Sequence, residues 1–429
     1  MNLTIRNASG AIVYFALFSA IVLNRDVFII SIGSLSTSFF AITFFILIPT
    51  LILCLLFRRL LNSTELFVFA GYSFFLIAII LSLLGREFIG NSVSEEYSTT
   101  FRLIAYSLML PMSYHCFGAL RFSGRKLFVA WWIIYFLVVF FGMLQVLAVN
   151  YPDSIFAQYF LWENIRGGER RVASLFRWQG PMVIFLSVSI VILLYSLGRE
   201  RGRFFSFLIL ISLLFGILVL LMSGSRTVLP NLLLLVSVAP FLLNLNISCK
   251  ILYYFVGVLG VPSLLIVVFA RSEFDGSSFG RIFGQGTHIE GLLDSPRFQI
   301  WGLLIESVSG SVSLFVFGLG AGASRQITGY DSHSGLIEIL TEHGILGLLG
   351  WCVFLFSVFF TGIIRSRVNR TPGDGNLIMF VSCCLLFFIY LFSASAIHYP
   401  WVYLLFGGLL YFVGSGYYSG NSIPEKIKC

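Results

Sequence analysis

The chain has 429 residues, of which 58% are hydrophobic, only 11% are charged and 47 are phenylalanine. A soluble protein of this size could not bury that much apolar surface, so the composition excludes the soluble classes and indicates an integral membrane protein. The formal net charge is +8, but the basic residues are scattered over short segments and form no continuous patch. We therefore expect no nucleic acid partner.

Twelve segments are long and apolar enough to cross a bilayer, which predicts an all-α, polytopic membrane protein that forms a single integral membrane domain over residues 1–429. The first apolar segment lacks the small-residue cleavage site of a signal peptide, so we expect it to remain as the first span. The predicted spans are 8–32, 35–57, 65–84, 101–120, 127–149, 180–197, 204–222, 228–245, 250–270, 344–364, 377–395 and 400–417.

The basic residues predict the orientation of these spans. With the N-terminus inside, fifteen of the 27 basic residues and only four of the 19 acidic residues fall in the inner segments. All four lysines lie inside, so every basic residue of the outer segments is an arginine. Two outer loops are long, about 150–179 and 271–343. Within the second, the run Phe298–Val316 is too polar for a span, and we expect an amphipathic helix at the outer interface or a re-entrant piece.

Several outer arginines suit the binding of phosphate. Arg226 lies in a very short turn between two apolar segments, where its planar fork and the N–H groups of the following helix could bind phosphate oxygens. Arg177, Arg297 and Arg325 lie on the same predicted side of the membrane. The alternative is that an arginine such as Arg226 reaches lipid headgroups.

His333 is the candidate for proton transfer, because it follows a long polar segment and precedes an apolar one. If the stretch is helical, His333, Ile337, Leu340, Gly344 and Gly347 share one face. The alternative is a histidine that merely caps a helix beside solvent.

Other ionisable residues have simpler interpretations. We expect Glu338 and Glu342 to be solvated, His343 to face lipid headgroups and His115 to be a satisfied core residue. The seven cysteines imply no disulfide framework and have no spacing typical of zinc sites, and the chain has neither a P-loop nor a Rossmann glycine pattern. We therefore expect no metal and no cofactor.

Together these features favour an amphiphilic substrate with its lipid tail in the bilayer and a phosphate at the surface, such as a lipid-diphosphate-linked sugar. The arginines would stabilise the diphosphate as the leaving group, and His333 would take a proton from the acceptor hydroxyl or orient it.

Five short segments resemble elements of the bacterial O-antigen ligase and O-antigen polymerase superfamily. They are His333-Ser334 with Gly344–Gly347, the segment Phe317–Gly320, the segment Arg297–Trp301, the turn Ser225–Thr227 and the segment Arg171–Phe176. In the last segment Ser174 stands where the family usually has glycine, and Trp178–Pro181 replaces the common Asn-Pro, which leaves the role of Arg177 open.

This resemblance implies a multi-helix membrane glycosyltransferase at the periplasmic face of a Gram-negative inner membrane, so that loops 150–179 and 271–343 would be periplasmic. It implies an inverting, metal-independent transfer from an undecaprenyl-diphosphate-linked glycan. It also implies that Arg226 and Arg297 contact the diphosphate and that His333 is the catalytic residue on the acceptor side.

Polymerase and ligase share these motifs and differ in their acceptor, which is a second lipid-linked repeat unit or lipid A-core. The modest size of the outer loops favours the polymerase, for which a chain-length regulator protein would be a partner. A polysaccharide transporter or flippase would need ionisable groups at mid-membrane, which the sequence lacks almost entirely. A non-catalytic assembly partner, in contrast, would tolerate the loss of His333.

Overall fold

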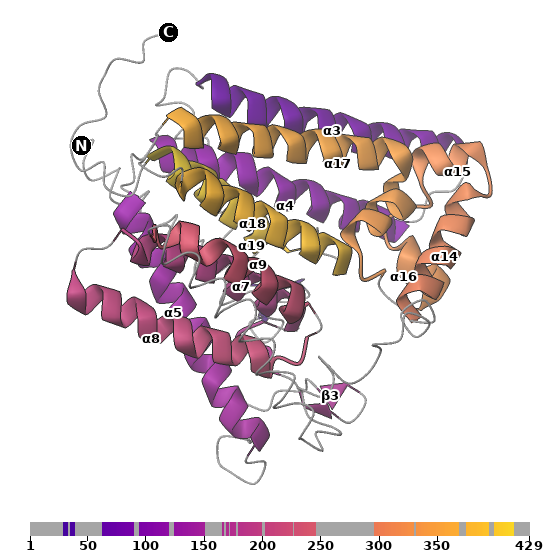
Figure 1. Ribbon diagram of the computed structural model, residues 1–429. Helices are drawn as coiled ribbons and strands as arrows, with labels where there is room; N and C mark the ends of the chain where they lie inside the picture. Colours follow the sequence, from indigo (N-terminus) through magenta and orange to yellow (C-terminus); the bar gives the residue numbers. More distant parts are fainter. Residues whose placement is uncertain are drawn as a thin grey trace.

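The computed structural model describes residues 29–32, 35–38, 62–89, 94–119, 124–150, 165–166, 169–170, 172–176, 179–199, 202–225, 227–245, 296–329, 332–368, 375–393 and 399–415. The helices of this part of the chain are α3 (Ser63–Ile89), α4 (Ser94–Ala119), α5 (Gly124–Asn150), α7 (Gln179–Leu197), α8 (Arg203–Met222), α9 (Val228–Leu242), α14 (Pro296–Ser309), α15 (Val312–Phe317), α16 (Ala323–Thr328), α17 (Gly335–Val368), α18 (Gly375–Ser393) and α19 (Pro400–Ser415). Figure 1 shows the long helices as a bundle, with α14, α15 and α16 gathered at one end of it.

Nine of the twelve predicted spans coincide with helices, namely α3, α4, α5, α7, α8, α9, α17, α18 and α19. Six of these, α3, α5, α7, α8, α17 and α18, are long and apolar enough to cross a membrane, and α9 and α19 are shorter apolar helices. The chain is therefore a multi-pass membrane protein, while the total of twelve spans stays a prediction. The predicted span 250–270 lies outside the described residues.

The first two predicted spans are wrong at the end of the first and the start of the second, where the structure has strands instead of helix. The ends of the predicted helices 8–32 and 35–57 form two antiparallel strands, β1 (Ile29–Ile32) and β2 (Leu35–Ser38). Isoleucine has a high strand propensity, and hydropathy alone does not distinguish an apolar strand from the end of an apolar helix. A second hairpin pairs β3 (Ile165–Arg166) with β4 (Glu169–Arg170) inside the predicted loop 150–179.

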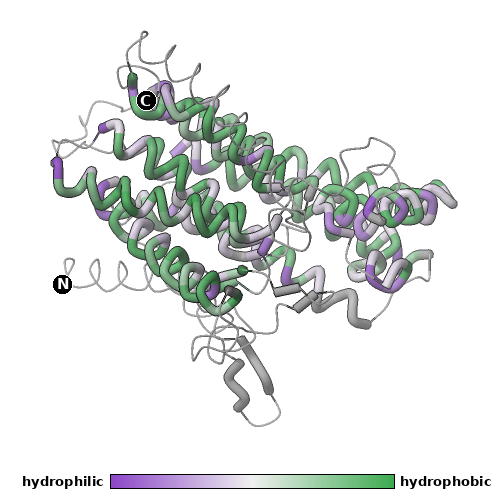
Figure 2. Tube along the Cα trace, turned by 60° about the horizontal axis from the view of Figure 1, so that its bottom comes forward, coloured by the Kyte–Doolittle hydropathy of each residue, from purple (hydrophilic) through white to green (hydrophobic). Residues whose placement is uncertain are grey.

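The long helices are apolar on the outside as well as in the core. α7 is buried along most of its length, as expected of a helix that is hydrophobic on all sides. On α3 and α8, apolar side chains such as Leu84 and Leu214 are exposed, which suits contact with lipid rather than water. Figure 2 shows the same pattern, since hydrophobic colour covers the long helices and hydrophilic colour is more frequent over the short helices at one end.

The helix ends that the charge pattern assigns to the inner side lie together at one end of the bundle, here called the Arg365 end. Arg365 on α17 donates from Nε to the Tyr114 hydroxyl of α4 at 2.7 Å, and this hydroxyl lies 3.1 Å from Thr64 Oγ1 at the start of α3. Near the end of α7, Tyr195 donates to Asn376 at the start of α18. These contacts agree with the predicted alternation of the spans, whose absolute orientation stays a prediction.

The opposite end, here called the His333 end, brings together the start of α17 and the ends of α3 and α18. Ser82 Oγ on α3 donates to the Phe317 carbonyl at 2.6 Å, and Ser334 Oγ donates to the Leu391 carbonyl of α18 at 3.4 Å. Here α17 contains a break, since Gly344 has φ +67° and ψ −169°. The predicted span 344–364 thus begins at this break, while the helix itself begins nine residues earlier.

Two glycines allow the chain to cross itself at this break. Gly318 also has a positive φ, and it lies against Gly344 so closely that a Cβ on either residue would come within 2.6 Å of the other's backbone nitrogen. The crossing is held by two backbone hydrogen bonds, from Leu319 to the Thr341 carbonyl at 2.8 Å and from Gly320 to the Glu342 carbonyl at 3.1 Å. The segment that follows α15 is therefore fixed against the first part of α17.

We predict that Gly318→Ala and Gly344→Ala each destabilise the protein by about 2–5 kcal/mol, because each adds the strain of a positive φ to a backbone clash. The measurement is thermal unfolding in detergent. Gly302→Ala on α14 is the matched control, since a Cβ there meets no atom within 4 Å. Equal stability of the three variants would contradict this account of the crossing.

Candidate functional site

His333 lies outside α17, two residues before the helix begins at Gly335. Its φ of +53° is left-handed, a conformation that is uncommon outside glycine, although asparagine, aspartate and histidine adopt it more often than other residues. The prediction that His333 shares a helical face with Ile337 and Leu340 is therefore wrong. The chain turns at Ser332–Ser334 because Ser334 acts as the N-cap of α17, so the helix cannot extend back to the histidine.

A set of hydrogen bonds fixes the turn that carries His333. Ser332 Oγ donates to the Ser334 carbonyl at 2.9 Å and lies 3.2 Å from the Ser334 backbone nitrogen. Trp301 on α14 donates from Nε1 to the Ser332 carbonyl at 2.7 Å. Ser332 and Ser334 are buried, whereas His333 is half-buried. The imidazole therefore sits on a rigid turn and remains partly accessible, as a residue that exchanges protons with a substrate must be.

Arg297 lies on α14 one helical turn before Trp301, and its side chain is exposed. The predicted run Phe298–Val316 does not span, because α14 ends at Ser309 and α15 begins at Val312. At 14 residues, α14 is about 21 Å long, too short to cross a bilayer core. It buries Leu304 and Val308 and exposes Phe298 and Leu303, so it is apolar on more than one side.

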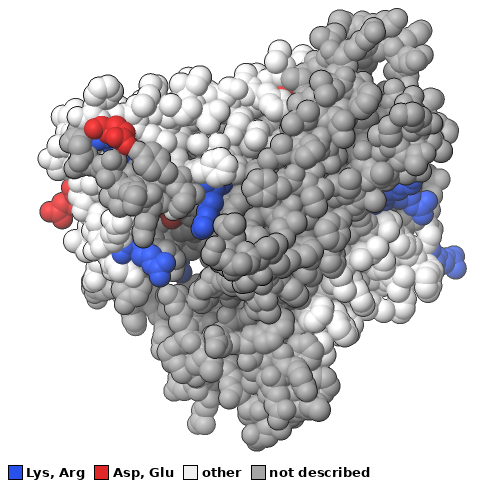
Figure 3. Space-filling view, turned by 180° about the vertical axis from the view of Figure 1, so that it is seen from behind, with Lys and Arg blue, Asp and Glu red and all other residues white. Residues whose placement is uncertain are grey.

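Arg325 lies in the last turn of α16 and is also exposed. Helices α14 and α16 pack against each other and against α17. The structure thus brings Arg297, Arg325 and His333 onto three neighbouring elements at one end of the bundle. Figure 3 views the molecule from behind and shows most of the visible charged side chains toward the ends of the long helices, with acidic and basic groups together near α14–α16.

Arg177 and Arg226 lie outside the described residues, but the segments that flank them are described. Before Arg177, Ser174 has φ +53°, and its backbone N–H donates to Gln145 Oε1 of α5 at 2.7 Å. This left-handed conformation gives a physical reason for glycine at that position. On either side of Arg226, the hydroxyls of Ser225 and Thr227 lie 2.8 Å apart.

The acidic and imidazole side chains near His333 are not solvated as predicted. Glu338 and Glu342 are 6% and 2% exposed, and His343 is 1% exposed, so the expectations of solvent and lipid headgroups are wrong for all three. The reason is tertiary, because α17 packs against α3, α14 and α15, and no residue from 335 to 343 is fully exposed. His115 is buried as predicted and its Nδ1 lies 3.3 Å from Glu65 Oε2, but its Nε2 has no hydrogen-bond partner among the described residues, so it is only partly satisfied.

Sequence reasoning missed Arg86, a fully buried arginine in the last turn of α3. Its Nη1 donates to the Glu342 carbonyl at 2.6 Å, next to the glycine crossing. The sequence places Arg86 in an outer segment, and nothing in the local pattern indicates that a partner 256 residues away buries it. Sequence reasoning also missed Glu342 as a structural group, although a carboxylate two residues before Gly344 could have suggested a polar contact where the apolar span begins.

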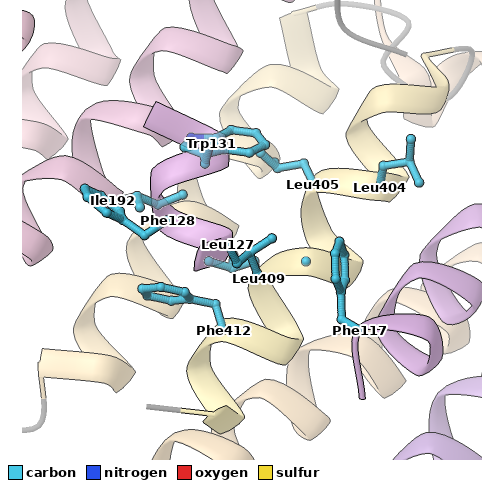
Figure 4. A pocket seen from close by; sticks show the side chains of 10 residues that line it. Phe117, Leu127, Phe128, Trp131, Ile192, Leu404, Leu405, Leu409 and Phe412 are labelled. Atoms are coloured by element: carbon cyan, nitrogen blue, oxygen red, sulfur yellow. The ribbon is translucent and has the colours of Figure 1, made fainter. Parts of the chain in front are cut away.

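Two cavities lie among the helices, and both are lined mainly by apolar side chains. One lies between α4, α5, α7 and α19, and Figure 4 shows Phe117, Leu127, Phe128 and Phe412 around it. The other lies between α4, α17, α18 and α19. Of the predicted site residues that the structure describes, His333, Arg297 and Arg325 line neither cavity, so these three lie apart from the apolar spaces.

Within the described part of the chain, no three His, Cys, Asp or Glu residues lie close enough together to hold a metal ion. No protein-family model matches the chain, and no curated protein is similar to it. At the His333 end, a partly accessible imidazole lies on a hydrogen-bonded turn, and the neighbouring helices α14 and α16 expose two guanidinium groups. Such a set can accept a proton and bind an anionic group.

We predict that Trp301→Phe loosens the His333 turn and leaves the fold intact. Phenylalanine keeps the aromatic contact with Phe298 but cannot donate to the Ser332 carbonyl, which costs about 1 kcal/mol. Backbone hydrogen exchange at residues 332–336 should rise about fivefold. Trp132→Phe, which removes the 3.2 Å bond to Ser212 on α8, should leave that segment unchanged, and a similar effect of both variants would refute the prediction.

Proposed function

We propose that this protein is a membrane glycosyltransferase that polymerises undecaprenyl-diphosphate-linked oligosaccharide repeat units at the periplasmic face of a bacterial inner membrane. The observation that carries the proposal is the arrangement of the His333 end. There a half-buried histidine lies on a hydrogen-bonded turn, beside two short helices that expose Arg297 and Arg325.

In the proposed reaction, an acceptor hydroxyl attacks the anomeric carbon of the lipid-linked sugar. A new C–O bond forms, the bond from the anomeric carbon to the diphosphate oxygen breaks, and the diphosphate leaves with the bonding electrons. His333 takes the proton of the hydroxyl, which suits an imidazole because its ordinary pKa lies near neutrality. Attack opposite the leaving group inverts the anomeric centre.

The arginines would stabilise the charge that develops on the leaving diphosphate. Arg297 and Arg325 are exposed on α14 and α16, and the resemblance assigns the same role to Arg226. One guanidinium group can donate two parallel hydrogen bonds to two phosphate oxygens, so several arginines together can neutralise the charge of a diphosphate. The membrane body suits the lipid anchor, because the exposed surface of helices such as α3 and α8 is apolar.

The distribution of buried charge favours a transferase over a transporter. The buried acidic, basic and histidine residues of the described chain are Glu65, Arg86, His115, Glu338, Glu342 and His343, and each lies within the first or last nine residues of its helix. A transporter would be expected to hold such groups near the midplane of the bilayer. In a surface transferase they are expected near the membrane surface.

We predict that His333→Asn abolishes long surface polysaccharide while the protein level stays within about twofold. Asparagine adopts a positive φ readily, so the turn should persist while the general base is lost, a change worth about 10²–10⁴ in rate. The measurement is the polysaccharide pattern of a deletion strain that carries each variant. His333→Gly, which also accepts this backbone, should behave like His333→Asn, and an unchanged pattern in both would overturn the role of His333.

We predict that Arg226→Ala and Arg226→Lys both reduce polysaccharide strongly, by about 10²–10³ in rate for the alanine variant, because lysine cannot form the paired contact. Arg203→Ala is the control, since Arg203 is an exposed arginine at the start of α8, at the opposite end of that helix from Arg226. If Arg226→Lys is as active as the wild type, the paired contact is wrong.

The lipopolysaccharide of the deletion strain distinguishes the acceptors. Core with a single repeat unit is expected for a polymerase, bare core would instead indicate a ligase that uses lipid A-core, and a wild-type ladder would refute both. The preference for polymerisation depends on the modest size of the predicted loops 150–179 and 271–343.

A further inference from the structure

Two charged residues that are absent from the predicted site meet at the glycine crossing. Arg86 at the end of α3 is 1% exposed, and Glu342 on α17 is 2% exposed. The Glu342 carbonyl accepts from Arg86 Nη1 at 2.6 Å and from the Gly320 nitrogen at 3.1 Å. The side chain of Glu342 also accepts, since its Oε1 lies 2.7 Å from the Gly322 nitrogen that donates to it. One residue of α17 therefore holds both α3 and the segment that leads into α16.

The face of α3 that meets the crossing is shaped for it. Gly85 and Arg86 follow Ser82 by three and four residues, so all three lie on one side of the helix. Ser82 donates to the Phe317 carbonyl, and Gly85 leaves room for the Phe317 ring, which a Cβ would strike. Burying a guanidinium and a carboxylate is costly, so their placement here needs a reason beyond filling space.

Along the chain, the crossing connects the segments that carry Arg325 and His333, the two groups of the proposed site that this inference concerns. On one side, Gly322 is followed by α16, and Arg325 comes three residues later. On the other side, Glu342 lies eight residues along α17 from Ser334, a rise of about 12 Å, and His333 precedes Ser334 directly. The hydrogen bond from Gly322 to Glu342 is thus the link that sets α16 against the start of α17.

We propose that Arg86 and Glu342 are positioning residues that hold Arg325 and His333 at a fixed separation, so that the diphosphate and the acceptor hydroxyl are aligned. This inference rests on the proposed function. Neither residue needs to touch the substrate. A displacement of about 1 Å at a reacting group can cost on the order of 10²-fold in rate, so loss of the link should lower turnover much more than donor binding.

The first test measures kcat and KM of the purified, full-length protein with a synthetic polyprenyl-diphosphate oligosaccharide. Arg86→Met and Glu342→Ala should lower kcat at least tenfold, with KM for the donor within about threefold of wild type. Glu342→Gln should retain most activity because its amide oxygen can still accept from Gly322, and Arg86→Lys should restore part of it because an ammonium group can donate to one carbonyl. An unchanged kcat in Arg86→Met and Glu342→Ala overturns the proposal.

Arg365→Met is the control for loss of an arginine that joins two long helices, although Arg365 is half-buried where Arg86 is fully buried. Arg365 donates to the Tyr114 hydroxyl and joins α17 to α4, but at the opposite end of the bundle. It should leave kcat near the wild-type value when activity is normalised to folded protein. A loss equal to that of Arg86→Met would show that any weakening of the bundle lowers turnover, and would overturn the positioning role.

The second test does not depend on activity. Spin labels at Gln326 on α16 and Leu349 on α17, both exposed, are introduced in a background without the seven native cysteines. The distance distribution should broaden in Arg86→Met and Glu342→Ala and stay narrow in Glu342→Gln and Arg365→Met. An unchanged distribution in Arg86→Met and Glu342→Ala refutes the positioning role. A wild-type protein that turns over no donor would refute the proposed function. The spin-label distances would still decide whether Arg86 and Glu342 fix α16 against α17.

Discussion

The contact between Gly318 and Gly344 is the constraint on which the His333 end depends. A side chain on either residue would clash with the backbone of the other, and both residues have a positive φ, which glycine adopts readily. The crossing determines where α17 breaks, and it places Thr341 and Glu342 so that their carbonyls bind Leu319 and Gly320. With the hydrogen bonds from Ser82 to Phe317 and from Trp301 to Ser332, it holds the short helices α14–α16 against the long helices.

The placement of polar groups follows the same logic throughout the described chain. The middle of the bundle is packed with aromatic and aliphatic side chains, such as Trp351 beside Phe75 and Phe354. Charged groups are buried only near helix ends, where backbone carbonyls and N–H groups remain available as partners. At the Arg365 end these partners are used to join α3, α4 and α17, and at the His333 end they also carry the candidate site.

Hydropathy was sufficient for the nine predicted spans that coincide with described helices, but not for the site geometry. It located α8 within one residue at its start, because apolar length is a local property. It could not locate the start of α17, since the helical residues 335–343 include Glu338, Glu342 and His343. The left-handed turn at His333, the buried Glu342 and the role of Arg86 depend on contacts between distant segments. His333, Arg297 and Arg325 were nevertheless predicted on one side, because charge pattern fixes the alternation of the spans.

The hydrogen bond between Arg86 and Glu342 also has a consequence for biogenesis. The two residues are 256 positions apart, so at typical translation rates α3 is made about 13–50 s before α17. During that interval the guanidinium must stay hydrated or rest among lipid headgroups, and α3 cannot dock permanently. Assembly of this end is therefore a late event, because it requires the insertion of α17, which ends at Val368.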